Sequence, residues 1–198
     1  INSKTSGNIV INTTSTALSG TSSNYLNAFA GTVTSSTGIF TITNSDYTIS
    51  DLITINSKTS GDLILSDTTA SLSGSVSDIK DAFAGTVTTH TGSVTITDAD
   101  ATDIAATDIS SINTSSTGSI TVSNAIDING SGSEVAAAFA AIDTNTGNAT
   151  ANITGSDYTI AQLKAINNAT DGAIVLVDPT VALSLSLIHI SEPTRQSL

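Results

Sequence analysis

The stretch Gly92-Ser93-Val94-Thr95-Ile96-Thr97-Asp98 contains a pattern that recurs along the whole 198-residue chain. In each copy a glycine is followed by apolar residues at the second and fourth positions, and the residues between them are mostly Thr, Ser or Asn. Strict alternation predicts a strand with one buried face and one face in water. Seven glycines open such a pattern: Gly7, Gly38, Gly61, Gly92, Gly118, Gly147 and Gly172. The sequence therefore predicts seven strand units.

Between these strands the apolar residues follow a helical period. Ile79, Phe83 and Val87 are each four positions apart, which places them on one face of a helix. The run Ala136–Ala141 also favours a helix, because alanine is the best helix former and a weak strand former. Further helices are expected over Tyr25–Val33, Ile49–Ile53, Val135–Ile142 and Ile160–Ile166. A strand followed by a helix in each interval between these glycines predicts parallel strands joined by crossovers.

Two of these helices carry a recognisable start signal. Thr48 is followed three positions later by Asp51, and Thr159 by Gln162, so both pairs resemble capping boxes. The corresponding stretch Asp103–Asn113 lacks the threonine at the cap position. We expect the helix in that copy to be looser.

Longer repeats indicate a single architecture for residues 1–184. Ile1–Gly7 recurs unchanged as Ile55–Gly61, and Ala28–Thr34 recurs as Ala82–Thr88, which gives a period of about 54 residues. Because the strands alternate in polarity, one sheet face should be open to water while helices cover the other. We expect an α/β repeat solenoid of double repeats, similar in architecture to a leucine-rich-repeat array although its consensus is absent. The alternative is a triangular β-helix in which the intervening segments are extended.

Composition excludes several classes of function. The chain has 17 acidic and five basic residues and a net charge of -12, which makes nucleic acids and anionic membrane surfaces poor partners. It has no cysteine, so disulfides, thiolate zinc sites and cysteine nucleophiles are excluded. No apolar run is long enough for membrane insertion, and no phosphate-binding, dinucleotide or metalloprotease motif occurs. We expect no enzymatic activity and no obligate cofactor.

The densest group of candidate ligands is Asp98, Asp100 and Asp103, which follow a predicted strand. Carboxylates stacked on neighbouring strands would lie close enough to share a calcium ion through their oxygens. The alternative is that these residues cap helices and form turns, as aspartate commonly does. His90, between a helix and a strand, has no visible partner for catalysis and is expected to be a surface turn residue.

The outward strand positions give a second candidate surface. Thr95 and Thr97 on one strand and Thr121 and Ser123 on another would face water. Regular threonine rows can organise water on ice, and an open polar sheet face can bind a glycan. Threonine is also simply a good strand former on a wet face.

The last residues differ from the repeat. A glycine is due at position 185, but Leu185 stands there. The following stretch, Leu185–Arg195, resembles the translation of an adapter used in sequencing libraries. Residues 185–198 are therefore predicted to be a non-native tail, and residues 1–184 a fragment of a longer array.

The motifs Ala82–Thr88, Thr91–Asp98 and Leu163–Thr170 resemble repeats in giant cell-surface and secreted proteins of marine bacteria, of the picocyanobacterial type. The resemblance implies an extracellular location and neighbouring repeats of the same chain as partners. It offers no catalytic residues. The leading hypothesis is a structural or adhesive spacer. The alternative is a solenoid that binds calcium or a glycan, and less favourably ice, through its open sheet face.

Overall fold

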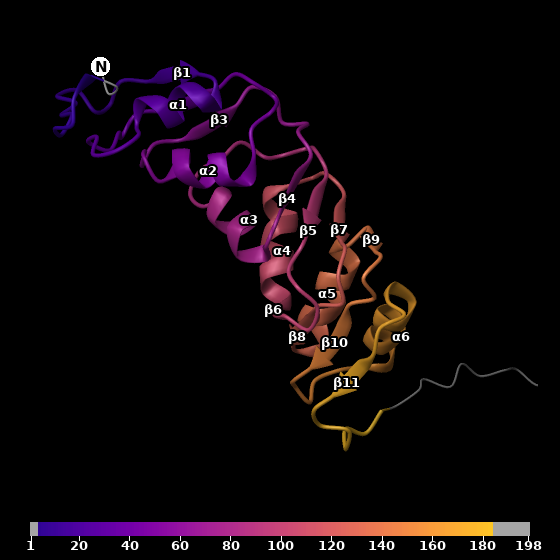
Figure 1. Cartoon of the computed structure of the whole chain (residues 1–198). Coiled ribbons are helices and arrows are strands. Elements are labelled where there is room, and N and C mark those ends of the chain that lie inside the picture. Colours follow the sequence, from indigo (N-terminus) through magenta and orange to yellow (C-terminus); the bar gives the residue numbers. More distant parts are fainter. Residues whose placement is uncertain (1–3, 184–198) are drawn as a thin grey trace, which may run out of the picture.

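The computed structural model describes residues 4–183. In this part of the chain six helices and eleven strands form an elongated, curved molecule (Figure 1). The helices are α1 (Ser22–Ala28), α2 (Ile49–Asn56), α3 (Val76–Ala82), α4 (Ala106–Ser115), α5 (Gly132–Ala141) and α6 (Ile160–Ala169). The strands are β1 (Leu18–Gly20), β2 (Phe40–Ile42), β3 (Leu63–Leu65), β4 (Leu72–Gly74), β5 (Val94–Ile96), β6 (Asp103–Ala105), β7 (Ile120–Val122), β8 (Asp127–Gly130), β9 (Thr144–Asn145), β10 (Thr150–Ile153) and β11 (Ile174–Leu176). The predicted non-native tail lies outside the described residues.

Every strand pair in the three sheets is parallel, which confirms the α/β prediction. The sheets have the strand orders β1-β2-β3, β4-β5-β7-β9 and β6-β8-β10-β11. Partners are close in the sequence, as in Leu18 with Phe40 in the first sheet and Val94 with Ile120 in the second. Each strand therefore pairs with a strand in the preceding or the following turn of the chain. We call each such turn, with its strand and helix, a coil.

The helices repeat with a slightly longer spacing than the strands. Successive helices begin at Ser22, Ile49 and Val76, whereas the paired strands β1, β2 and β3 begin at Leu18, Phe40 and Leu63. Each helix packs against the next from α1 to α6. Because the strands recur at shorter intervals of sequence than the helices do, the paired strand occupies a different position in each successive coil relative to the helix. One continuous sheet is therefore replaced by three shorter ones along the molecule (Figure 1).

Six of the seven predicted strands form, as β2, β3, β5, β7, β10 and β11. The first does not, because Ile9 makes only an isolated bridge to Val33. The prediction missed five short strands, and four of these end immediately before a helix or its capping residue. The sequence Leu-Ser-Gly at 18–20 and again at 72–74 marks two of them.

The predicted capping boxes are confirmed. The Thr48 hydroxyl accepts from the Asp51 amide while the Asp51 carboxylate accepts from the Thr48 amide, and Thr159 with Gln162 repeats the arrangement. Helix α4 has no side-chain cap, as expected, but it is ten residues long and therefore no shorter than its neighbours. Its N-cap residue is Ala105, which has no side-chain oxygen to accept from the first-turn amides.

Two predicted helices end earlier than the apolar spacing indicates. Val33 and Val87 lie beyond Gly31 and Gly85, which adopt positive φ values of 71° and 74°. This left-handed conformation, which suits glycine, terminates α1 and α3. The two valines then make bridges with Ile9 and Leu63.

The glycines that open the strand units mark places where successive coils touch. A Cβ added at Gly118 would lie 1.8 Å from the Gly92 carbonyl oxygen, and one at Gly92 would lie 2.1 Å from the Ala70 oxygen. A side chain of any size would collide with the backbone of the previous coil. Gly38, Gly61, Gly147 and Gly172 are equally close to the backbone of the previous coil. We call these four, with Gly92 and Gly118, the coil-contact glycines.

The core runs the length of the molecule as one cluster of buried side chains from Tyr25 to Ile166. Alternation along the strands is confirmed, since in β2, β5 and β7 the first and third residues are buried and the middle one is partly exposed. The intervening segments are helical, so the β-helix alternative is wrong for them.

Candidate functional site

The outward positions of the middle sheet form a row of hydroxyl groups. The register of β4, β5, β7 and β9 aligns Ser73, Thr95, Thr121 and Thr144 across the four strands. The other two sheets interrupt such rows, with Ile64 in β3 and Val175 in β11. We call the aligned Ser73, Thr95, Thr121 and Thr144 the hydroxyl row.

The three aspartates predicted to bind calcium have separate hydrogen-bond donors. Asp98 accepts from the Val76 amide at 2.8 Å, Asp100 accepts from the Ala125 amide at 2.8 Å, and Asp103 accepts from the Asn129 side chain at 3.0 Å. Within residues 4–183 no group of three metal-ligating side chains lies together. The structure thus gives Asp98 a helix-capping role, pairs Asp100 with a backbone amide and pairs Asp103 on β6 with a side chain on β8. It does not assemble the three carboxylates into a ligand set.

The role of Asp98 recurs along the molecule. Its carboxylate caps the N-terminus of α3, which lies in the preceding coil. Asn44 does the same for α1, because its side-chain oxygen accepts from the Ser22 amide at 2.7 Å. Polar residues after β2 and β5 therefore bind one coil to the helix of the coil before it.

Other aspartates stabilise turns. Asp67 accepts from the hydroxyl and the amide of Thr69, and Asp178 accepts from the same groups of Thr180. These hydrogen bonds hold the pKa of both carboxyl groups below the usual range. Close to the turn at Asp67, burial and the charge of the Asp67 carboxylate raise the pKa of Tyr47 to about 12. The Tyr47 hydroxyl donates to the Asp67 carbonyl oxygen, so it is a structural donor.

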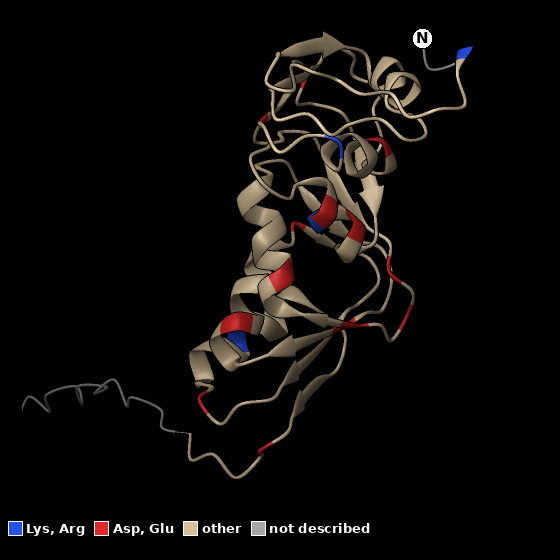
Figure 2. Cartoon of the chain, turned by 90° about the vertical axis from the view of Figure 1, so that its left-hand side faces the viewer, with Lys and Arg blue, Asp and Glu red and all other residues tan. Residues whose placement is uncertain are grey.

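Charged groups are scattered along the molecule rather than gathered at one place (Figure 2). The ion pair that the described residues contain joins Lys80 on α3 to Asp108 on α4, at the surface. None of the helices described is long and apolar enough to cross a membrane.

His90 is completely buried, so the prediction that it is a surface turn residue is wrong. It occupies a position that is serine, threonine or asparagine in other coils, two residues before a coil-contact glycine. Ser36 is at the equivalent position of another coil. Its hydroxyl accepts from the Gly38 amide and donates to the Thr14 carbonyl oxygen of the previous coil. Thr170 makes the same two bonds with Gly172 and Ala149. The polar residue in this turn points inward because the previous coil satisfies it.

The imidazole of His90 does not make the hydrogen bonds that Ser36 and Thr170 make. Among the described residues, neither ring nitrogen has a hydrogen-bond partner, and the ring packs against Phe83 with centroids 5.7 Å apart. Burial lowers the pKa of His90 from its ordinary value, because the charged form loses hydration. The Ala70 backbone and the Asp67 carboxylate act in the opposite direction, with smaller effects than burial.

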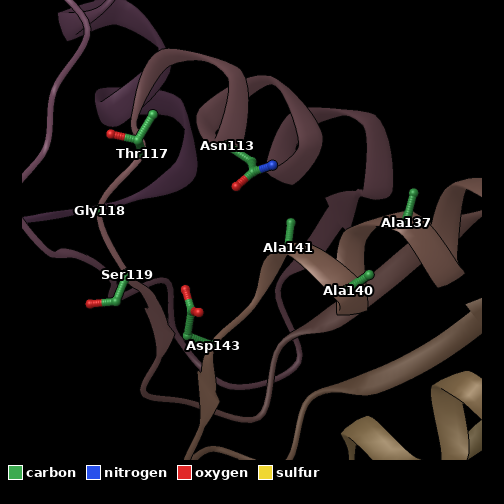
Figure 3. A pocket seen from close by; sticks show the side chains of 8 residues that line it. All are labelled: Asn113, Thr117, Gly118, Ser119, Ala137, Ala140, Ala141 and Asp143. Atoms are coloured by element: carbon green, nitrogen blue, oxygen red, sulfur yellow. The ribbon is translucent and has the colours of Figure 1, made fainter.

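A hollow of about 450 Å³ lies where the turn after α4 faces α5 (Figure 3). Asn113 and Asp143 point into it from opposite sides, and Ala137, Ala140 and Ala141 of α5 form another wall. The Asp143 carboxylate also accepts from the Ile120 amide at 2.8 Å. Thr117 and Ser119 also line the hollow, so two hydroxyl groups, a carboxylate and an amide lie beside the wall of alanines.

Comparison with protein-family models, with curated proteins and with solved structures finds no match to this chain.

Proposed function

We propose that this chain is part of a repeat solenoid, similar in architecture to a leucine-rich-repeat array, that serves as a rigid, non-enzymatic spacer in a large extracellular bacterial surface protein. The observation that carries the proposal is the series of coil-contact glycines, which lock each coil against the previous backbone. The resemblance to giant surface proteins supplies the location.

Three further features support a spacer. The core is continuous from coil to coil, so bending the molecule would open buried apolar contacts. The side chains of Asn44 and Asp98 accept hydrogen bonds that join their coils to the helices α1 and α3 of the preceding coils. His90 is buried in the core, and among residues 4–183 no group of three metal-ligating side chains lies together.

Removal of coils one at a time from the C-terminal side tests the spacer. Variants ending before Gly172, Gly147 and Gly118 should each keep a folded, elongated shape. We expect the maximum dimension from X-ray scattering to fall by roughly 5 to 10 Å per coil, the spacing of packed strands and helices. The urea midpoint should fall gradually, because a repeat array gains stability from each neighbouring interface. Collapse to a compact particle, or loss of all structure at one boundary, would contradict the proposal.

The hydroxyl row favours a second candidate function, binding of a glycan through the open face of the middle sheet. The side chains of Ser73, Thr95, Thr121 and Thr144 stand on successive strands, roughly 4.8 Å apart, which is a distance that neighbouring sugar hydroxyls can bridge.

A charge placed in the centre of the row tests this candidate. Thr95→Lys should reduce binding to immobilised bacterial surface glycans by about five- to tenfold, since a lost hydrogen-bonded contact is worth about 1 to 1.4 kcal/mol. Ser133→Lys, on the exposed surface of α5, is the matched control and should leave binding unchanged. Equal binding by both variants would exclude the hydroxyl row.

A further inference from the structure

The hollow between α4 and α5 lies where the repeat makes a coil-to-coil hydrogen bond elsewhere (Figure 3). Counted back from the coil-contact glycine that follows each of them, Asn113 in α4 is equivalent to Asn56 in α2. The Asn56 side chain donates to the Ala84 carbonyl oxygen of the next coil at 2.8 Å. The Asn113 side chain points into the hollow instead, and it has no hydrogen-bond partner within residues 4–183.

The helix that faces each asparagine explains the difference. Helix α3 ends at Ala82, and Gly85 in the turn that follows adopts a positive φ of 74°. Counted from the phenylalanine of each coil, the residue equivalent to Gly85 is Ala141, and α5 continues to this residue. The carbonyl group that Asn56 binds belongs to the turn after α3, whereas α5 is still helical at this position. Asn113 is therefore left free to bind something else.

Asp143 is a second difference between the two coils. It stands where the earlier coil has Val87. Its carboxylate accepts from the Ile120 amide at 2.8 Å, whereas the equivalent Leu63 amide donates to the backbone carbonyl oxygen of Thr86. This contact uses one carboxylate oxygen, and the other has no partner among the described residues. A charged acceptor thus faces the hollow where the repeat has an apolar side chain.

These side chains select the kind of group that can bind between them. The Asp143 carboxylate only accepts hydrogen bonds, while the Asn113 amide can also donate them. A hydroxyl group satisfies both, because it donates and accepts. An ammonium group cannot accept from the Asn113 amide, and the Asp143 charge repels an anion. Thr117 and Ser119 add two more hydroxyl groups to the lining.

The size and the wall of the hollow suit a sugar ring. Its volume of about 450 Å³ lies within the range of roughly 300 to 1,000 Å³ that is usual for small-molecule sites. The methyl groups of Ala137, Ala140 and Ala141 form an apolar wall, against which the C–H groups of a sugar can pack. Asn113 and Asp143 are both exposed, so a dissolved ligand can reach them.

We propose that the hollow binds a neutral sugar, whose adjacent hydroxyl groups bridge the Asp143 carboxylate and the Asn113 amide. The proposal goes beyond the spacer function and does not depend on it. The site uses none of the residues of the hydroxyl row, so it is a separate binding site on the same molecule.

Titrations of the full chain with three neutral probes, followed by saturation-transfer NMR, test the site. The probes are the methyl glycosides of glucose, galactose and mannose, and at least one of them should bind. Asn113→Ala should weaken this binding by about five- to tenfold, because one hydrogen bond to the sugar is lost. Ala140→Leu should abolish the binding, because the larger side chain occupies the hollow.

Asn56→Ala is the matched control, because it removes the same side chain where that side chain bonds to the protein itself. Sugar binding should be unchanged, while the Tm should fall by about 2 to 4 °C through loss of the bond to Ala84. Asn113→Ala should show the opposite result, with weaker binding and an unchanged Tm. A purely structural role for Asn113 would lower the Tm in both variants.

Three results would overturn the proposal. The first is that none of the three glycosides binds. The second is that Asn113→Ala and Ala140→Leu bind the sugar as well as the original chain does. The third is that methylammonium chloride displaces the sugar from the hollow at equal concentration, which would assign the hollow to amines. The spacer function is tested separately by coil removal, so it stands or falls independently of these results.

Discussion

Replacing Gly118 with alanine should destabilise the protein more than any other single methyl group added to its surface turns. The new Cβ would lie 1.8 Å from the Gly92 carbonyl oxygen and 2.4 Å from its carbonyl carbon. The two coils must separate, which strains the bond that Thr117 donates to the His90 carbonyl oxygen. We expect a loss of about 3 kcal/mol, the upper end of the usual cost of overpacking. A thermal melt should show a fall in Tm of about 6 to 12 °C for a chain of this length.

Two other glycines separate this steric effect from glycine's backbone freedom. A Cβ at Gly20 would meet nothing closer than 3.5 Å, so Gly20→Ala should be neutral or slightly stabilising. Gly85 has no atom within 4 Å of the added Cβ but adopts a φ of 74°, so Gly85→Ala should cost about 1 kcal/mol through its conformation alone. If Gly118→Ala melts like Gly20→Ala, the coils do not approach as closely as described.

Replacing His90 with leucine should stabilise the protein and remove part of its acid sensitivity. Leucine fills a similar volume beside Phe83 and leaves no buried nitrogen without a partner. Removing an unsatisfied buried polar group is worth about 1 to 3 kcal/mol at pH 7. Urea unfolding of the two proteins at pH 7.5 should show this difference directly.

The pH dependence follows from the lowered pKa of His90. Above the ordinary pKa of 6.5 the imidazole is neutral in both the folded and the unfolded chain, so its contribution to stability is complete. As the pH falls below that value the unfolded chain takes up the proton first, and the free energy of unfolding decreases by at most about 1.4 kcal/mol per pH unit. The loss ends when the pH passes the lowered folded pKa.

His90→Leu should lack this component of the acid slope. Equal slopes for the original chain and His90→Leu between pH 7.5 and 5.5 would show that His90 is not buried in its neutral form.

The sequence predicted the elements that depend on local pattern. Alternation after a glycine found β5 and β7, and the hydroxyl followed by an acid or amide found the capping box of α2. The alternation of apolar and polar residues along the strands predicted one open strand face. These features could be predicted because each is encoded within a short run of neighbouring residues.

Features that depend on contacts between coils could not be predicted in the same way. The glycines were visible as a period, but the reason for them is the backbone of the previous coil, as where Gly118 meets Gly92. His90 looked like a surface residue because a polar residue shortly before a glycine is typical of a turn. The signal that would have found its burial is its alignment with Ser36 and Thr170, whose hydroxyls bond the coil before.

The positions of the three aspartates relative to one another could not be predicted, for the same reason. Asp98 and Asp100 looked like neighbouring ligands because they are close in the sequence. Separate donors from neighbouring coils, the Val76 and Ala125 amides, draw the two carboxylates into different hydrogen bonds. Proximity in the sequence does not reveal such donors, since they belong to other copies of the repeat.

The short sequence separation between paired strands has a consequence for how the chain is made. Each strand finds its partner in an adjacent coil, as β1 does in β2 and β5 in β7, so no pairing waits for a distant part of the chain. The entropy lost in closing each coil is nearly constant, and the folding barrier should not grow as coils are added. A chain of this kind can fold from its N-terminus as it emerges from a ribosome or an export pore, with each finished coil serving as the template for the next. Duplication of coils can therefore lengthen such a protein without slowing its folding.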